Sequence, residues 1–188
     1  MDHYLDITLL PDPEFSHNHL MDALFAKLHR ALVIAGCGDI GISFPQVNGQ
    51  GTGLGMVLRV HGQAARLGHL MAANWLAGMR DHTTLSGIEI VPSTCNSFRV
   101  VSRVQAKSSP ARERRRLMRR KGLTEEQAHV RIPDHCAEML HLPYVKVRSQ
   151  STAERFLLFI RHGAVQATPA EGAFSAYGLS PTGTIPWF

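Results

Sequence analysis

Along the first ninety positions, apolar residues recur with two different periods, that of a strand and that of a helix. Residues 4–10 alternate from one position to the next and are rich in β-formers, which predicts a strand. Ser16 can cap a helix, and Gly36 can end it. Between them, apolar side chains recur at helical spacing, at Leu20, Ala23, Leu24, Leu28, Ala31 and Leu32. This spacing predicts an amphipathic helix with one face on a core.

Four more elements complete this part of the chain. Strands are predicted at 40–44, 54–60 and 88–91, and a helix at 63–79. The inward residues of that helix are Ala64, Leu67, Leu70, Met71, Trp75 and Met79. The resulting order, βαββαβ, is typical of the ferredoxin-like unit. We therefore expect a ferredoxin-like domain over about residues 1–92.

The rest of the chain predicts a second domain after a linker at residues 92–97. A strand at 98–106 leads to a helix at about 110–121, and a capping box at 124–127 opens another helix. Later elements are two paired strands, a short strand and an apolar end, at 144–148, 155–162, 174–177 and 186–188. We expect an α+β fold with a C-terminal α/β domain over residues 98–188.

The predicted helix at 110–121 carries most of the positive charge. Pro110 suits a first helical position, Gly122 suits the position after the last, and Ser108 or Ser109 can supply the N-cap. One face, an arc of roughly 140°, gathers five arginines. These are Arg112, Arg115, Arg116, Arg119 and Arg120. The ordinary alternative is a solvated face or a disordered basic run. Arginine outnumbers lysine, however, and its fork of donors suits phosphates and guanine edges, which favours nucleic-acid binding.

The net charge supports a localised anion site. The chain carries +5 overall, whereas Lys107–Lys121 alone contains eight basic residues and one acid, or +7. The other residues therefore sum to −2. A protein whose positive charge lies in one segment is better suited to a specific anionic ligand than to general binding of anions.

Several classes of site find no support in the sequence. The three cysteines are scattered and form no CxxC, which argues against a disulfide framework or a zinc ribbon. Neither a Walker loop nor an acidic cluster for two-metal nuclease chemistry is present. Glycines at 49, 51, 53 and 55 lie between two predicted strands, which favours a hairpin turn over a phosphate loop. The acidic start and the lack of a long apolar run predict a cytoplasmic protein.

Two groups of residues could supply proton-transfer chemistry to a metal-free nuclease. His29 lies late in the first predicted helix, just off its apolar stripe, where it could face a partner domain or could simply be a solvated histidine near a helix C-terminus. Residues 148–152 (RSQST) offer three hydroxyls, an amide and a guanidinium between two predicted strands. They could hold a ribose hydroxyl or a phosphate, or form an ordinary polar turn.

At these residues the chain resembles the CRISPR repeat-processing endoribonucleases of type I-F systems, over essentially its whole length. The matching pieces are MDHYLD at 1–6, KLH at 27–29, SRVQAK at 102–107, RRRLMRR at 114–120, RSQST at 148–152, LFIRHG at 158–163 and the closing PWF. The resemblance departs at Glu113, where an apolar residue is expected, and in the loop at 46–53.

This resemblance implies an enzyme that binds the hairpin of a CRISPR repeat transcript and cuts once at the 3′ foot of the stem. It implies no metal and no cofactor: the RNA's own 2′-hydroxyl attacks, leaving a 2′,3′-cyclic phosphate and a 5′-hydroxyl. It further implies retention of the CRISPR RNA product and association with other subunits of the type I-F surveillance complex. The implied fold is a ferredoxin-like domain followed by a domain with the arginine helix.

The resemblance also assigns residues. His29 matches the proton-transfer histidine, Ser149 the serine that holds the 2′-hydroxyl, with Ser151 secondary, and Tyr177 the residue that orients the histidine. For RNA binding it implies Arg103 and Gln105 as base readers, Arg116 and Arg120 as groove arginines, Lys107, Arg112, Arg115 and Arg119 on phosphates, and Phe156 as the stacking aromatic. The alternative to an enzyme is a non-catalytic RNA-hairpin-binding or assembly protein.

Overall fold

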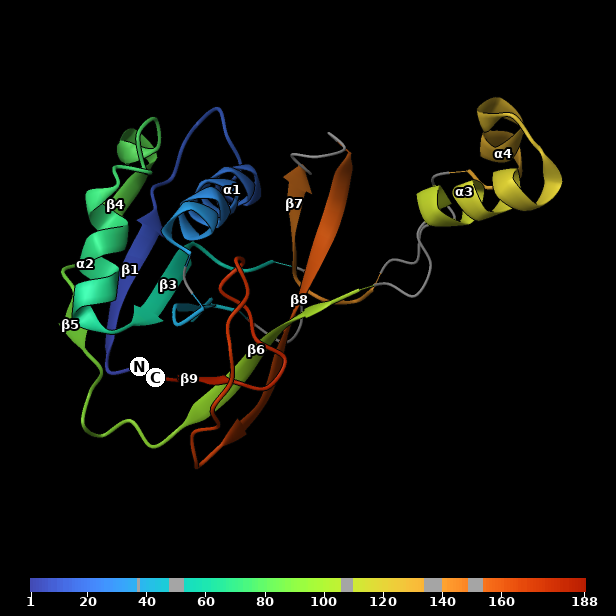
Figure 1. The fold of residues 1–188 in the computed structure, drawn as a ribbon. Coiled ribbons are helices and arrows are strands. Elements are labelled where there is room, and N and C mark those ends of the chain that lie inside the picture. The colour runs from blue at the N-terminus through green and yellow to red at the C-terminus, as the bar shows by residue number, and fades with distance from the viewer. Residues whose placement is uncertain (37, 48–52, 106–109, 134–139, 149–153) are drawn as a thin grey trace. The chain divides into compact units, whose positions relative to one another are not determined.

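The computed structural model of the chain describes residues 1–36, 38–47, 53–105, 110–133, 140–148 and 154–188. The predicted site residues Lys107, Ser149 and Ser151 lie outside these ranges, as do Ser108 and Ser109. The chain forms two compact units (Figure 1). The larger joins Met1–Val104 with Leu142–Phe188, and the smaller is Gln105–His141. The division into domains at 1–92 and 98–188 stays a prediction.

The first sheet of the larger unit is antiparallel throughout. Its strands are β1 (His3–Leu9), β2 (Gly41–Ser43), β3 (Val57–Gly62), β4 (Thr83–Leu85) and β5 (Glu89–Ile90). Their order is β2-β3-β1-β4, and β5 also pairs with β1. Leu5, Ile7 and Leu9 of β1 alternate into the core, and each is at most 2% exposed. The helices α1 (His17–Ala35) and α2 (Ala64–Ala72) both pack against β1.

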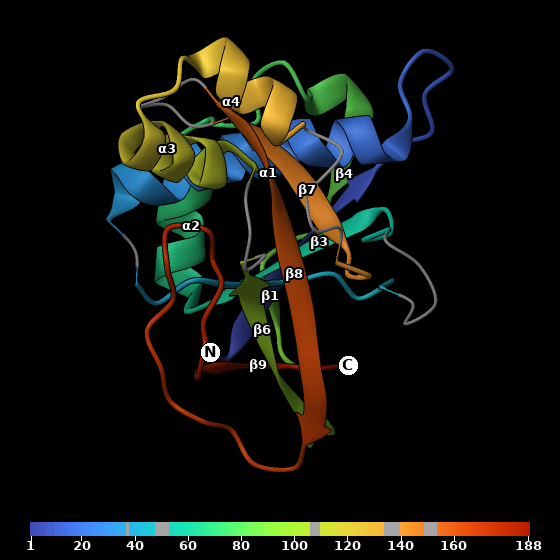
Figure 2. The same ribbon diagram turned by 90° about the vertical axis from the view of Figure 1, so that its right-hand side faces the viewer.

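The second sheet is also antiparallel, with the strand order β7-β8-β6-β9. Its strands are β6 (Phe98–Val104), β7 (Tyr144–Arg148), β8 (Arg155–Gln166) and β9 (Thr184–Pro186). Figure 2 shows the long β8 running beside β6 and β7. α1 contacts β7 as well as β1, and Asp22 Oδ1 accepts a hydrogen bond of 2.8 Å from the Lys146 N–H. This helix therefore packs against both sheets.

The end signals predicted for α1 are confirmed. Ser16 Oγ accepts a hydrogen bond from the His19 N–H, and Gly36 ends the helix in the left-handed conformation with φ +62°. The buried face includes Leu24, Leu28 and the other predicted leucines. Burying each such side chain stabilises the fold by about 1.5–3 kcal/mol.

The smaller unit contains two helices within its described residues, α3 (Pro110–Lys121) and α4 (Glu125–Arg131). Gly122 follows α3 with φ +61°, and its N–H donates to the Met118 carbonyl at 2.9 Å. Thr124 caps α4, and both hydrogen bonds of the predicted capping box are present. The arginine helix and the helix after it are therefore confirmed as elements.

The described residues thus form an α+β fold with two antiparallel sheets and four α-helices, which confirms the predicted class. The helix predicted at 63–79 was too long, because α2 ends at Ala72 and Asn74 adopts φ +48°. Asparagine enters this left-handed region more readily than most residues. Leu76 and Met79 are still buried, through short turns, so their spacing looked helical.

Two strand predictions also need correction. On the edge of β1 away from β3, the first partner strand is β4, which we missed, and the predicted strand at 88–91 is reduced to β5. The segment at 174–177 is not a strand, and the last strand is β9. Phe174 is buried in the core, and the residues after it form a tight turn. Their aromatic character reflects packing rather than sheet pairing.

Residues near the two ends of the chain meet in the larger unit, where the rings of Tyr4 and Phe188 pack edge to face with centroids 4.9 Å apart. Arg59 of β3 pairs with both carboxylate oxygens of Asp6, and its guanidinium lies over the rings of Tyr4 and Phe188. No helix within the described ranges is both long enough and apolar enough to span a membrane.

Two histidines of the larger unit, one fully buried and one half-buried, are held neutral. His61 of β3 is fully buried and shares a hydrogen bond of 2.8 Å with Ser43 Oγ; burial, and then the positive charge of Arg59, lower its pKa to about 3. His162 of β8 lies against the rings of Phe44 and Trp187, and burial lowers its pKa to about 4. Neither ring can exchange protons usefully near neutral pH.

We predict that stability falls as the pH drops from 7 to 5. Between about pH 6.5 and the lowered pKa values, the unfolded chain binds protons at His61 and His162 that the folded chain does not. Each histidine should lower the free energy of unfolding by on the order of 2 kcal/mol at pH 5. Urea unfolding at both pH values measures this drop. His61→Gln, which cannot ionise, should lose part of it, and an unchanged drop in that variant would contradict the assignment.

Candidate functional site

His29 occupies the last third of α1 and is half-buried. Its Nδ1 atom lies 2.8 Å from the backbone carbonyl oxygen of Ala176. A carbonyl oxygen can only accept, so Nδ1 carries a proton and donates it to this hydrogen bond. In the neutral ring, Nε2 is then the atom with the free lone pair. The ring is therefore arranged to exchange a proton at Nε2.

The ring of Tyr177 lies against this imidazole. The two rings are stacked, with centroids 4.1 Å apart and an interplanar angle of 15°. The Tyr177 ring is also nearly parallel to Phe25, one turn earlier on α1, at 6.1 Å and 12°. The predicted pair of His29 and Tyr177, separated by most of the chain, is thus brought together in one contact.

Arg103 of β6 extends this group of aromatic side chains. Its Cζ atom lies 5.5 Å from the ring centroid of Phe156, on β8, and 5.6 Å from that of Tyr177. Both distances fall within the range of cation–π attraction. Four of the predicted site residues therefore form a connected group in the larger unit, which we call the His29 cluster: His29, Tyr177, Arg103 and Phe156.

The predicted serines cannot be placed relative to this cluster, since Ser149 and Ser151 are outside the described residues. The strand residues that flank them, Arg148 and Arg155, pair with each other at the ends of β7 and β8. Among the described residues, no group of three or more His, Cys, Asp or Glu side chains is arranged to hold a metal ion.

The smaller unit carries the predicted basic face. The five arginines of that face, Arg112, Arg115, Arg116, Arg119 and Arg120, are all exposed. Arg114 lies off the face and is partly buried, and its Nε donates a hydrogen bond of 2.6 Å to the Ile132 carbonyl after α4. Gln105, at the start of this unit, is also exposed. The charge available to a ligand is thus concentrated on one side of α3.

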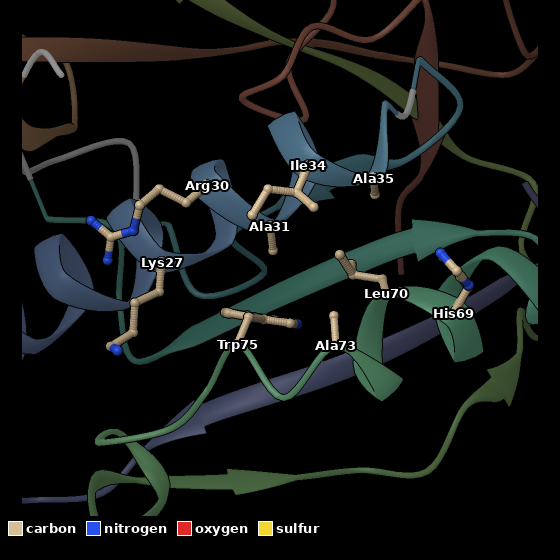
Figure 3. Close-up of a pocket in the computed structure, with 9 residues that line it drawn as sticks. All are labelled: Lys27, Arg30, Ala31, Ile34, Ala35, His69, Leu70, Ala73 and Trp75. Atoms are coloured by element: carbon tan, nitrogen blue, oxygen red, sulfur yellow. The ribbon is translucent and has the colours of Figure 1, made fainter. Parts of the chain in front are cut away.

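A cavity of about 320 Å³ lies between α1 and α2 (Figure 3). Apolar side chains, among them Ile34 and Trp75, form most of its wall, and Lys27, Arg30 and His69 line its edge. None of the predicted catalytic or RNA-binding residues lines it. The cavity and the His29 cluster are therefore separate features of the larger unit.

The comparison with known proteins gives this geometry a context. Residues 4–188 match the family described as CRISPR-associated protein (Cas_Csy4). The chain belongs to the Cas_Csy4 family. It is 54% identical over its full 188 residues to the "CRISPR-associated endonuclease Cas6/Csy4" of Pseudomonas aeruginosa (strain UCBPP-PA14), and 50% identical over the same length to the protein of that name from Escherichia coli (strain UTI89 / UPEC). Both relatives are covered over their whole length.

This membership confirms the family resemblance found in the sequence, whereas the roles assigned to single residues stay predictions. Two contributions to the site were missed. One is the Ala176 carbonyl, which belongs to the backbone and gives no signal in the sequence. The other is Phe25, whose spacing of four residues from His29 on the same helix could have indicated a shared neighbour.

We predict that the ring of Tyr177, not its hydroxyl, orients His29. Tyr177→Phe should keep the upfield ring-current shift that stacking imposes on the carbon-bound imidazole protons, whereas Tyr177→Leu should lose it. Proton NMR of the two variants, with selectively labelled histidine, checks this. Equal histidine spectra in Tyr177→Leu and in the unsubstituted chain would show that the rings do not stack in solution.

Proposed function

We propose that this chain is an endoribonuclease that binds the stem-loop of a CRISPR repeat RNA and cuts it at the 3′ base of the stem. The observation that carries the proposal is the His29 geometry: Nδ1 donates to a backbone carbonyl, so that Nε2 is available to transfer a proton. Two relatives that match over the full length, both named as CRISPR-associated endonucleases, support the same activity.

The proposed reaction needs no water as nucleophile and no metal. The 2′-hydroxyl upstream of the cut loses its proton and its oxygen attacks the phosphorus, while the bond to the 5′-oxygen breaks. The products are a 2′,3′-cyclic phosphate and a 5′-hydroxyl, with one proton removed from O2′ and one delivered to O5′. His29 Nε2 carries out one of these transfers: it accepts when the ring is neutral and donates when the ring is protonated.

The neighbouring residues would position the reacting groups. We propose that Tyr177 holds the plane of the imidazole through the stacking of the two rings. We propose that Ser149 holds the 2′-hydroxyl in line with the phosphorus and that Ser151 assists it. Alignment of this kind can supply a large part of the reduction in the reaction barrier.

The basic face of α3 is proposed to supply most of the affinity for RNA. Arg116 and Arg120 would enter the major groove of the stem, while Lys107 and the other face arginines contact phosphates. The A-form major groove is normally too narrow and deep for side chains. A hairpin opens this groove next to its loop, and long arginines on a short helix could enter there.

Bases below the stem are proposed to be read by Arg103 and Gln105, with Phe156 as the stacking platform. Arg103 lies within cation–π distance of both Phe156 and Tyr177, which supports a binding surface continuous with the His29 cluster. Such a surface would place the cut next to the residues that recognise the foot of the stem.

At the level of the fold, we propose that residues 1–92 form a ferredoxin-like domain and residues 98–188 a C-terminal RNA-binding domain. The strand order β2-β3-β1-β4, antiparallel throughout, with helices after β1 and β3, supports the first assignment. We further propose that the chain retains its CRISPR RNA product and joins other subunits of a surveillance complex.

A non-catalytic RNA-hairpin-binding or assembly protein is the alternative. Incubating the protein with end-labelled repeat hairpin in EDTA separates the two, because only the enzyme releases a shortened product. A product that ends in a cyclic phosphate supports the proposed chemistry. Full-length RNA after long incubation would favour the binding protein.

The first prediction separates binding from cutting. His29→Ala should retain hairpin affinity, since one imidazole adds little to contacts made mainly by arginines. It should slow cleavage by about 10²–10⁴-fold, the contribution usual for a proton-transfer group. Filter binding and single-turnover cleavage measure the two quantities. His17→Ala, an exposed histidine at the start of the same helix, should change neither. Wild-type cleavage by His29→Ala would remove His29 from the mechanism.

The second prediction concerns the arginine face. Arg116→Ala with Arg120→Ala should weaken hairpin binding by several kcal/mol, since each bidentate groove contact is worth about 1–3 kcal/mol. The slope of log K against log salt should stay steep, because Lys107 and the other face arginines still contact phosphates, and each such contact contributes about 0.7–0.9. Arg131→Ala with Arg161→Ala removes two exposed arginines outside α3 and is the matched control. Equal affinity of the two double variants at moderate salt would overturn the assignment.

The third prediction identifies the nucleophile. A hairpin with one 2′-deoxy nucleotide just upstream of the cut should bind nearly as tightly as all-RNA, because the arginine contacts are unchanged. It should resist cleavage both with and without added magnesium, because the attacking oxygen is missing. Binding and product formation are measured on the same substrate. Any cleavage of the deoxy hairpin would indicate attack by water instead.

A further inference from the structure

Two consecutive residues of the turn that carries Tyr177 contact the side chain of His29. Ala176 offers its backbone carbonyl to Nδ1, and the next residue lays its ring on the imidazole. The position of the His29 ring thus depends on the backbone at residues 176 and 177, which are far from it in the sequence. What holds these positions in place therefore also fixes the protonated nitrogen of His29.

The turn is closed by its own hydrogen bonds. The Gly178 N–H donates to the Ser175 carbonyl at 2.8 Å, and the Ser175 N–H donates to the Leu179 carbonyl at 2.9 Å. The Tyr177 N–H also donates to Ser175 Oγ, at 3.3 Å. These bonds fix Ala176 and Tyr177 between them.

Both sheets of the larger unit anchor the turn. The Ile42 N–H of β2 donates to the Gly178 carbonyl at 2.9 Å, and the Ser180 N–H donates to the Val101 carbonyl of β6 at 3.0 Å. On the other side, the Phe174 N–H donates to the Gly38 carbonyl at 2.9 Å. The turn is therefore held at both ends as well as at its tip.

Gly178 is the position of this turn that leaves least room for a side chain. Its φ is +70°, which L side chains rarely adopt, and a Cβ built on it would lie 2.7 Å from Ile42 Cγ2 and 3.3 Å from Ile42 Cγ1. An added methyl group must push the turn away from β2 or displace a fully buried side chain.

We propose that Gly178 is a positioning residue for His29: by letting the turn approach β2, it places the Ala176 carbonyl so that Nδ1 stays protonated and Nε2 stays available. The inference rests on the proposed role of His29 in cleavage. It adds a residue that touches neither the RNA nor the reacting atoms, and acts only through the backbone.

Gly178→Ala tests this directly. Without RNA, the ¹⁵N shifts of the His29 ring nitrogens should move away from the pattern of the Nδ1-protonated tautomer. With repeat hairpin RNA, single-turnover cleavage should slow by about 10–100-fold, the loss expected from a misplaced catalytic group, at unchanged affinity. Gly78→Ala is the matched control, because Gly78 has φ +76° but open space around it. It should share the backbone strain and leave both readouts unchanged.

A second substitution separates positioning from a general loss of stability. Ile42→Ala removes the Cγ atoms that the new methyl group would meet, leaving Ile42 Cβ as the nearest atom at 3.4 Å. Added to Gly178→Ala, it should lower stability further, yet restore the tautomer signal and much of the cleavage rate. Should Gly178→Ala not fold, Ser175→Ala removes the Oγ bond to the Tyr177 N–H at an exposed residue and should shift the tautomer in the same direction.

The outcomes distinguish this inference from the proposed function. An unchanged tautomer in Gly178→Ala, or a double variant worse than Gly178→Ala in both readouts, overturns the role of Gly178. An altered tautomer with an unchanged cleavage rate supports the role of Gly178 and overturns the role of His29 in cleavage. An altered tautomer with slower cleavage, rescued by Ile42→Ala, supports both.

Discussion

The hydrogen bond from His29 to the Ala176 carbonyl is the contact on which the rest of the site depends. It joins positions 147 residues apart, and it decides which ring nitrogen is free to transfer a proton. For this bond to form, α1 has to lie against the same core as the segment that precedes β9. Because α1 packs against strands of both sheets, the position of the His29 imidazole depends on the packing of the whole larger unit.

The chain separates two physical tasks. In the larger unit, fully buried His61 and half-buried His162 are held neutral, whereas His29 donates a hydrogen bond from Nδ1 to the Ala176 carbonyl. The smaller unit holds the exposed arginines of α3, to which the proposed function assigns the attraction for phosphates. Under the proposed function, affinity and chemistry therefore depend on different residues, which lie in different units.

Local signals in the sequence predicted most of the fold. Ser16 and Gly36 marked the ends of α1, Pro110 and Gly122 those of α3, and Thr124 opened α4 through its capping box. Each signal depends on hydrogen bonds within a few residues. Errors arose where apolar residues are buried outside regular structure but are spaced as in a helix. Beyond Ala72, for example, turns bury Leu76 and Met79.

The candidate site was predictable only in part, and for a physical reason. The resemblance pointed to His29 and Tyr177, and the structure brings them into contact, although their roles stay predictions. Spacing along the chain could not show that a side chain of α1 bonds to the backbone near the C-terminus. Contacts of this kind depend on how distant elements pack, which no short stretch of sequence records.

The carbonyl at position 176 has a consequence for how the site can be studied. Since the acceptor is a main-chain oxygen and the residue is already alanine, a scan of alanine substitutions would pass over it without a signal. Sequence comparison is equally blind to it, because every residue type supplies the same oxygen. Evolution could therefore exchange the side chain at this position freely while keeping the acceptor, and the part of the site that sets the histidine tautomer would leave no trace in an alignment.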